Sequence, residues 1–331
     1  MQSSPSHPQY YKLPGNNIIE EENLQLVSIV LATYNGEKYL EEQLESLLAQ
    51  TYSNIEIIAI DDGSSDHTVS ILHNYAAKHN NMKVFVNEMN LGFIKNFEKG
   101  CTLTKGDFIA FCDQDDYWDF DKIKKMTEAI GEHPLIYCDS IVCDENLNPK
   151  GIKISDLVHF RSWNNCLQLA VFCRIYAHAM LFTRSFFNAA YPFLGVVPPD
   201  WWLPYLSTFY GGMKYLPEPL VLYRQHENNA MGVTGGKSKK QSKVKRSEKI
   251  RLDKEKIRTR IKAFYNACPN DMTKEKEVLH KLVKSYESFS LINNFRRCAL
   301  FFRYRNIFLS VKKHSSLHRF FFCFKMFVKI K

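Results

Sequence analysis

Four short apolar segments, each leading into a polar turn, constrain the fold of this chain more than any other feature. They are VSIVLAT at 27–33, IEIIAI at 55–60, KVFV at 83–86 and FIAFC at 108–112. Apolar residues at helical spacing follow, and we expect the last three helices near 67–78, 93–103 and 119–130. This alternation predicts an α/β fold with a mostly parallel sheet and helices on both faces. Ligands of such folds gather at the carboxyl ends of the strands.

The turns at these strand ends are rich in carboxylates. Tyr34-Asn35-Gly36 follows the first segment, Asp61-Asp62-Gly63-Ser64 the second and Asp113-Gln114-Asp115-Asp116 the fourth. No GxGxxG pattern follows the first strand, and GGKS at 235–238 has Met231 where a phosphate loop needs its first glycine. We therefore do not expect a dinucleotide dehydrogenase or a P-loop NTPase. Clustered carboxylates favour a hard divalent cation, Mg²⁺ or Mn²⁺, shared with substrate phosphates.

The charge of the chain is divided between an acidic body and a basic C-terminal third. The net charge is +9, but residues 1–236 carry −11, whereas residues 237–262 and 295–331 each carry +10. With 45% hydrophobic residues, the chain can bury one large domain plus an appendage. We predict four regions: a polar extension at 1–24, the main domain at 25–232, a basic flexible linker at 233–249 and a basic, aromatic-rich helical region at 250–331.

Several motifs occur together in the order and spacing of one enzyme family. They are VSIVLATYNGEKYLEEQLESLLAQTY, IAIDDGSSDHT, NLGFIKNF and GDFIAFCDQDDYW. Over roughly residues 25–232 the chain resembles the inverting family 2 glycosyltransferases, which have the GT-A fold. The DQDDYW, PPDWW and LYRQHENNAMG segments are most similar to bacterial rhamnosyltransferase-type enzymes that build capsule, lipopolysaccharide or cell-wall polysaccharides.

The resemblance implies a site for a nucleotide-sugar donor. The implied donor-binding residues are Tyr34, Asp62, Asn90, Gly92, Lys95, Asn96, Asp113, Gln114 and Arg224. Tyr34 would lie at the base, and Asp62 would accept a hydrogen bond from the ring N–H of uracil or thymine. Many relatives have arginine where this chain has Lys95, which leaves a bidentate phosphate contact in doubt. The alternatives are a turn aromatic at Tyr34, an Asp62 carboxylate that closes the DDGSS turn, and a plain helix start near Gly92.

Asp113 and Asp115 form a DxD signature, and the resemblance implies that they and His226 hold Mn²⁺ or Mg²⁺. Such a cation neutralises the departing diphosphate. The alternative is that the carboxylates of this segment cap the next helix, with Asp116 the best placed to do so, and that His226 is a surface residue. ENNAMGVTGG, which follows His226, is expected to close over the donor as a lid.

Asp200, in VPPDWWLPYL, matches the position of the general base of the family. It would take the proton of the acceptor hydroxyl while that oxygen attacks the anomeric carbon, in a single displacement with inversion. Asp200 also suits the N-cap of a helix, and Glu218 is the fallback carboxylate. The implied donor is dTDP-L-rhamnose, otherwise a UDP-hexose, and the implied acceptor is a hydroxyl of a lipid-linked or growing polysaccharide.

The C-terminal third interleaves aromatic and basic residues. Residues 295–331 hold ten of each and no acidic residue. This pattern favours an interfacial contact with an anionic membrane, and packing of the helices on the main domain is the alternative. The start of the chain lacks the features of a secretory signal, so we expect a cytoplasmic protein at the inner face of the cell membrane. RNA binding and a non-catalytic nucleotide-sugar-binding protein are the rival functions, although no nucleic acid is expected.

Overall fold

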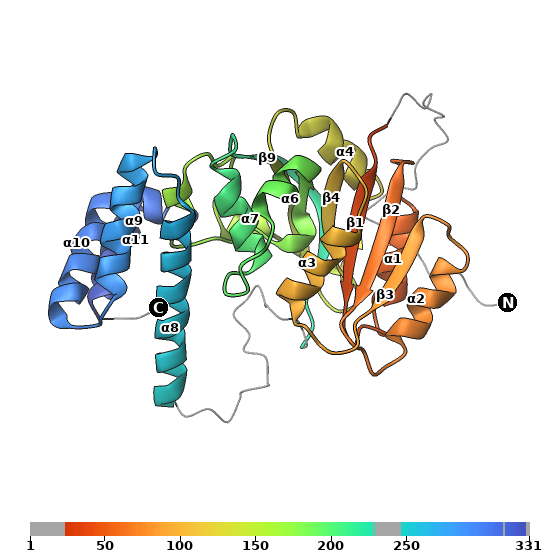
Figure 1. The fold of residues 1–331 in the computed structure, drawn as a ribbon, viewed down its shortest axis with the longest axis horizontal. Helices are drawn as coiled ribbons and strands as arrows, with labels where there is room; N and C mark the ends of the chain where they lie inside the picture. Colours follow the sequence, from red (N-terminus) through yellow and green to blue (C-terminus); the bar gives the residue numbers. More distant parts are fainter. Residues whose placement is uncertain (1–23, 228, 230–245, 314, 329–331) are drawn as a thin grey trace.

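The structure is a computed structural model that describes residues 24–227, 229, 246–313 and 315–328 (Figure 1). The strands are β1 (Val27–Thr33), β2 (Ile55–Asp61), β3 (Met82–Val86), β4 (Phe108–Asp113), β5 (Tyr117–Trp118), β6 (Leu135–Cys143), β7 (Pro149–Lys153), β8 (Met180–Thr183) and β9 (Met213–Arg224). The helices are α1 (Leu40–Leu48), α2 (Thr68–Ala76), α3 (Phe93–Leu103), α4 (Lys122–Ala129), α5 (Ile154–Leu157), α6 (Arg184–Ala190), α7 (Pro199–Ser207), α8 (Arg246–Ala267), α9 (Thr273–Tyr286), α10 (Leu291–Phe308) and α11 (Ser316–Val328). Two 3₁₀ turns are η1 (Cys166–Gln168) and η2 (Ala177–Ala179).

One sheet runs through the larger part of the molecule, in the order β3-β2-β1-β4-β8-β6-β9-β5, with β7 on β6. The four predicted strands pair in parallel, β2 with β3 and β1 with both β2 and β4. Beyond β4, β8 runs antiparallel to both β4 and β6, and β9 is parallel to β6. The α/β prediction is confirmed, and the antiparallel part of the sheet is an addition that the repeating unit did not reveal.

The apolar runs form central strands because both of their faces are covered. Val27, Ile29 and Leu31 of β1 pack into a cluster with α1, whereas Val30 packs on the opposite face with Phe97 of α3. All four β1 residues are fully buried. A strand that is covered on both sides needs apolar residues at every position, which explains the unbroken hydrophobic run.

The helix after β4 begins later than predicted. We expected it near 119–130, but α4 begins at Lys122, because Tyr117 and Trp118 form β5 and pair with β9 instead. The N-cap of α4 is Asp121, and its side chain makes no capping hydrogen bond. The alternative in which the carboxylates of the DQDD segment cap this helix is therefore wrong.

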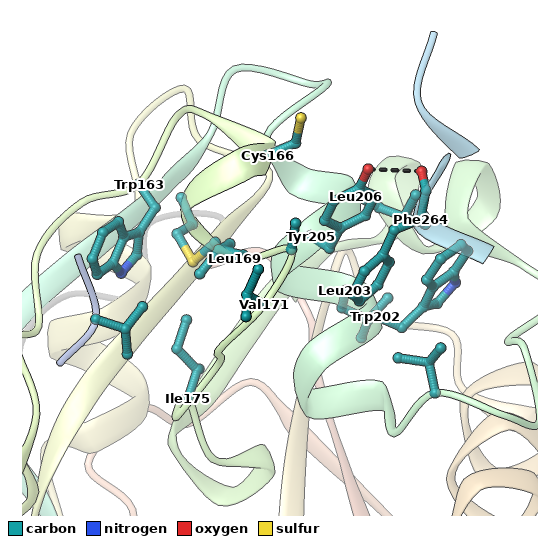
Figure 2. Close-up of a cluster of buried hydrophobic side chains, with 14 of the residues drawn as sticks. Trp163, Cys166, Leu169, Val171, Ile175, Trp202, Leu203, Tyr205, Leu206 and Phe264 are labelled. Carbon is teal, nitrogen blue, oxygen red and sulfur yellow. Dashed lines mark hydrogen bonds between the residues drawn. The ribbon is translucent and has the colours of Figure 1, made fainter. Parts of the chain in front are cut away.

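The basic C-terminal region folds into α8–α11, at the end of the molecule opposite β1–β3 (Figure 1). Aromatic stacking joins α8 to the sheet domain. Phe264 of α8 stacks on Tyr205 and Trp202 of α7, and Tyr205 Oη donates to the Phe264 carbonyl at 2.7 Å (Figure 2). At the far end, Lys313 Nζ donates to the Ser155 carbonyl at 2.9 Å. These contacts give the two regions one shared hydrophobic core.

None of the helices that the structure describes is long and apolar enough to cross a bilayer. Apart from Glu227 and Asn229, the expected lid after His226 lies outside the described residues, and so does most of the expected linker at 233–249.

Close packing of α3 on the sheet predicts the effect of a substitution at Gly100. A Cβ there would lie 2.5 Å from Val30 Cγ1 and 3.1 Å from Ile60 Cγ2. Alanine gains about 1 kcal/mol of helix propensity over glycine, whereas overpacking a core costs about 1–3 kcal/mol. We expect Gly100→Ala to lower the free energy of unfolding by about 1 kcal/mol in urea denaturation. Gly195→Ala, at an exposed position with no neighbour within 4 Å, is the control and should be neutral; equal stability of the two variants would contradict the packing argument.

Candidate active site

The loops after β1 and β4 are joined by one side chain. Gln114 accepts from the Tyr34 backbone N–H at 2.8 Å and donates to the Tyr34 carbonyl at 3.1 Å. Gly36 lies against the Gln114 amide, where a Cβ would clash with it. The Tyr34 side chain remains 49% exposed. Tyr34 and Gln114, both expected at the donor, are therefore adjacent at the sheet edge, with the aromatic ring open to solvent.

The two aspartates after β2 have different partners. Asp61 closes the DDGSS turn by accepting from the backbone N–H groups of Gly63 and Ser64. Asp62, which is 3% exposed, instead accepts from Asn87 Nδ2 and from the backbone N–H groups of Leu91 and Gly92, at 2.8–2.9 Å. The turn-closing alternative thus applies to Asp61, and Asp62 holds the 87–92 loop. A carboxylate has about four acceptor positions, so one on Asp62 Oδ2 stays available.

The residues expected along the donor phosphate mainly stabilise this loop. Asn90 Nδ2 donates to the Asp62 carbonyl, and Gly92 has a φ of 80°, which favours glycine. Asn96 is 2% exposed and donates to the Ile60 carbonyl at 2.9 Å, so its amide lies inside the fold. Lys95 is 49% exposed and pairs with Glu98 at 2.6 Å. Of these four residues, Lys95 is the charged one, and its side chain is accessible to solvent.

The carboxylates of the DQDD segment turn in opposite directions. The Asp113 and Asp115 side chains are 39% and 17% exposed, whereas the Asp116 side chain is fully buried. Asp115 Oδ2 lies 2.7 Å from His226 Nε2, so the structure brings together two of the three expected metal ligands. Asp113 instead belongs to a group with Asp116 and His178, whose ligand atoms all lie within 4.8 Å of one another.

Asp116 and His178 form a buried charge pair that the sequence did not reveal. His178 Nδ1 lies 3.0 Å from Asp116 Oδ2 and 3.6 Å from Asp113 Oδ2. The shorter distance is that of an ion pair, but the ring N–H is not aligned for a hydrogen bond, which leaves Asp116 Oδ2 without one among the described residues. Although burial alone would lower it, the negative charges of Asp116 and Asp113 raise the pKa of His178 to about 9. Asp116 was expected to cap a helix, and that expectation is wrong.

A buried lysine, Lys122, contacts the backbone of His178. Lys122 Nζ donates to the His178 carbonyl at 2.6 Å and lies 3.0 Å from the centre of the Trp118 ring. Burial lowers the pKa of Lys122 to about 8. The local sequence around His178, YAHAM, is apolar and gave no signal of this role.

Arg224 is 1% exposed and fully engaged by the protein. Its guanidinium donates to the carbonyls of Asp115 (2.8 Å) and Glu145 (2.5 Å) and pairs with the Glu42 carboxylate. Its backbone N–H donates to Asp116 Oδ1 at 3.1 Å. We expected Arg224 to meet donor phosphates, but in this structure it fixes the backbone of the DQDD segment instead.

Asp200 lies in the first turn of α7, whose N-cap is Pro198, so it does not serve as the N-cap. Burial, together with the charge of Asp113, raises the pKa of Asp200 to about 7. The negative charge of Asp113 raises the pKa of Asp200 and the positive charge of His178 lowers it, so this carboxylate interacts electrostatically with the residues around the DQDD segment. The fallback carboxylate, Glu218 on β9, pairs with Lys125 of α4 at 3.0 Å.

The geometry therefore defines one site at the carboxyl ends of β1, β2 and β4, with an exposed aromatic ring, a carboxylate cluster and an acid of raised pKa. Glycosyltransferases of the GT-A fold have this arrangement of sheet and helices. The family model of glycosyl transferase family 2 matches residues 28–187. This is the segment that carries the motifs quoted above, so the match supports the resemblance to family 2 glycosyltransferases.

Two of the curated relatives are named as glycosyltransferases. A protein of Haemophilus influenzae named as an uncharacterized glycosyltransferase is 28% identical over 263 residues, which cover 73% of this chain and 79% of the relative. The putative glycosyltransferase EpsH of Bacillus subtilis is 42% identical over 115 residues, 34% of this chain and 33% of EpsH. Rv1520 of Mycobacterium tuberculosis is 31% identical over 209 residues and is matched over 59% of its length.

Solved structures confirm the GT-A fold. Residues 1–349 of S. aureus TarS, in complex with UDP-GlcNAc, superpose with a TM-score of 0.57 at 19% identity, covering 85% of this chain and 81% of that structure. The mannosyltransferase PcManGT of Pyrobaculum calidifontis, in complex with GDP-Man and Mn²⁺, gives 0.50 at 15% identity, covering 85% and 75%. These structures support the fold, whereas the family model and the relatives named as glycosyltransferases support glycosyltransferase function.

The contact between Gly36 and Gln114 generates a double-mutant test. In the parent, Gly36→Ala should displace the Gln114 amide, break both hydrogen bonds to Tyr34 and lower the free energy of unfolding by about 1–2 kcal/mol. In a Gln114→Ala background the new methyl group has nothing to displace, so the same substitution should cost much less. Urea denaturation of the four proteins measures the difference. Additive costs would show that Gly36 matters for another reason.

Proposed function

We propose that the protein transfers a sugar from a nucleoside-diphosphate donor to an acceptor hydroxyl, with inversion, in a single displacement. The observation that carries this proposal is the combination of two outward carboxylates, Asp113 and Asp115, with a nearby acid, Asp200, whose pKa is about 7. A general base works best when its pKa lies near the operating pH. No covalent intermediate is needed, since one base and one leaving group suffice.

The residues present fit a divalent cation. Carboxylate and imidazole groups are ligands of Mn²⁺, and the ligand atoms of Asp113, Asp116 and His178 all lie within 4.8 Å of one another. Asp113, Asp115 and His226 would hold the ion, because their side chains reach the surface, whereas those of Asp116 and His178 are at most 1% exposed. When bound, the ion supplies positive charge to the leaving diphosphate.

The chain's own residues hold the donor and move the proton. Tyr34 would contact the base, and the remaining acceptor position of Asp62 would take the ring N–H of a uracil or thymine. Lys95 could leave Glu98 for a phosphate oxygen, because an exposed ion pair contributes at most about 1 kcal/mol. Asn90, Gly92, Asn96, Gln114 and Arg224 would act by fixing these loops. Asp200 accepts the proton of the attacking hydroxyl.

For the substrates, we propose dTDP-L-rhamnose or a UDP-hexose as donor and a lipid-linked or growing polysaccharide as acceptor. The motif resemblance supports rhamnose, and the UDP-GlcNAc complex of TarS supports a UDP-sugar. The Mn²⁺ in the PcManGT complex supports the cation. A lipid-linked acceptor also agrees with a position at the inner face of the cell membrane, for which the exposed aromatic side chains of α11 are the structural support.

Thermal stabilisation by nucleotides tests the site. A ligand that binds the native state raises its melting temperature. We expect dTDP or UDP with Mn²⁺ to raise Tm, GDP and CMP to have less effect, and each nucleotide without metal to be weak. The loss of the metal effect in Asp115→Asn, with retention in Glu218→Gln as control, would support the assignment. A folded protein that responds to no nucleotide would refute the transferase proposal.

Asp200→Asn separates chemistry from binding. The variant should abolish transfer and retain the nucleotide response, because asparagine is similar in shape but cannot take a proton. A variant that still transfers at a near-parent rate would remove Asp200 from the mechanism.

The raised pKa of Asp200 also predicts a change in stability with pH. Because the folded-state pKa of about 7 lies above the ordinary value of 3.8, the ionised carboxylate destabilises the fold, and this cost grows from about pH 4 to pH 7. In metal-free protein, Asp200→Asn should therefore raise Tm by about 2–4 °C at pH 8 and leave it unchanged near pH 4. Asp271→Asn, at an exposed position, is the control and should do neither. A lower Tm at pH 8 would indicate a structural role for the carboxylate.

A further inference from the structure

A large apolar surface is exposed on α10 and α11. Its members are Leu291 (74% exposed), Ile292 (67%), Phe295 (68%), Leu317 (65%), Phe320 (42%), Phe321 (56%), Phe324 (50%) and Phe327 (36%). Scattered exposed apolar residues are normal, but a continuous set of this kind marks an interaction site. We call this set the apolar face.

The apolar face is continuous across the two helices. Leu291, Phe295 and Phe302 lie four and seven residues apart and so share one side of α10. The Phe302 ring, in turn, contacts Phe320 at 5.0 Å and Phe324 at 4.8 Å between ring centres. One strip of apolar side chains therefore runs from the start of α10 to α11.

A basic pocket opens beside this strip, between α9 and α10. Its volume is about 540 Å³, and its lining is His280, Lys281, Lys284, Phe295, Arg296, Ala299, Leu300, Arg303 and Tyr304. Phe295 belongs to both the pocket and the apolar face. Lys281 and Lys284 pair with Glu277 and Glu287 on α9, in exposed ion pairs that a stronger anion can replace.

The arginines of α10 have different environments. Arg297 is 1% exposed and donates to the carbonyls of Met326 and Ser285, so it holds the helices together. Arg296 and Arg303 are exposed, and Arg296 donates to the neutral Asn293 amide. Because residues 295–331 contain no acidic residue, this side of the molecule keeps a positive potential.

We propose that this surface docks on an anionic lipid bilayer, with the phosphate of one lipid headgroup in the pocket between α9 and α10. The pocket supplies four cationic side chains for the phosphate, and the adjoining apolar face enters the acyl boundary of the same leaflet. A second copy of the chain would bring two basic surfaces together and is disfavoured. Five phenylalanines of the apolar face can stack on nucleic-acid bases, but Leu291, Ile292 and Leu317, which are the more exposed part of it together with Phe295, cannot. The proposal does not depend on the transferase assignment.

Co-sedimentation of the full chain with vesicles tests the proposal, using phosphatidylglycerol/phosphatidylcholine mixtures against pure phosphatidylcholine. We expect binding to the anionic vesicles alone. Arg296→Glu/Arg303→Glu should lower the bound fraction at least about tenfold, since each basic residue near an anionic surface contributes measurably. Leu317→Ser/Phe321→Ser should also weaken binding. The matched control is Lys78→Glu/Lys83→Glu, which makes the same change in net charge at exposed positions on the opposite end of the molecule (Figure 1) and should bind like the parent.

Circular dichroism and the melting temperature, measured on the same samples, show that each variant is folded. Three results would overturn the proposal: a parent that binds neither vesicle type, pocket and control variants that bind equally, or a parent that binds RNA but not lipid. Self-association that the serine variants abolish, without vesicle binding, would assign the apolar face to a second copy and would overturn it as well.

Discussion

The balance of charge at the end of β4 is the constraint on which the site depends. Three carboxylates within four residues repel one another unless cations offset them. Asp116 turns inward to His178, Asp115 meets His226, and the Arg224 guanidinium binds the backbone that carries both. The Asp113 side chain remains 39% exposed. Arg224 comes from β9 and His178 from η2, so segments outside the parallel strands supply the positive charges around this cluster.

The parallel half could be predicted from the sequence because its signals are local. β1 follows from an apolar run buried on both faces, and α3 was expected within its observed bounds from apolar spacing after Gly92. The start of α4 was missed because β5 exists only through pairing with β9, about a hundred residues away. No local pattern reports such a pairing.

The site residues also divide into those that local motifs reveal and those that depend on distant parts of the chain. The motifs identified Asp113, Asp115, His226 and Asp200; the structure brings Asp115 to His226, and the charge of Asp113 acts on Asp200. What the motifs did not reveal was the direction of each side chain. Arg224 and Asn96 look like ligand-binding residues in the sequence, yet their polar groups are used within the protein. His178 and Lys122 carry no motif, because a buried ion pair is recognised only once its partners are adjacent in space.

In the C-terminal helices, the sequence likewise does not distinguish buried aromatic residues from exposed ones. Phe301 and Phe308 are fully buried, whereas Phe321 and Phe295 are among the most exposed large side chains of the chain. A run such as HRFFFCF reads as one amphipathic signal, but α10 and α11 use part of it to pack on each other and on Phe172 of the sheet domain. Core and surface functions are interleaved residue by residue, which explains why packing and interfacial contact looked like alternatives in the sequence.

The long separation between Asp115 and His226, 111 residues, has a consequence for synthesis of the protein. A nascent chain that has left the ribosome as far as β8 already contains every strand of the parallel half and all three carboxylates. It still lacks Arg224 and His226. Until β9 emerges, His178 and Lys122 are the positive side chains near the cluster, and the contacts of Arg224 and His226 cannot form, so the final assembly of this region is a late event of translation.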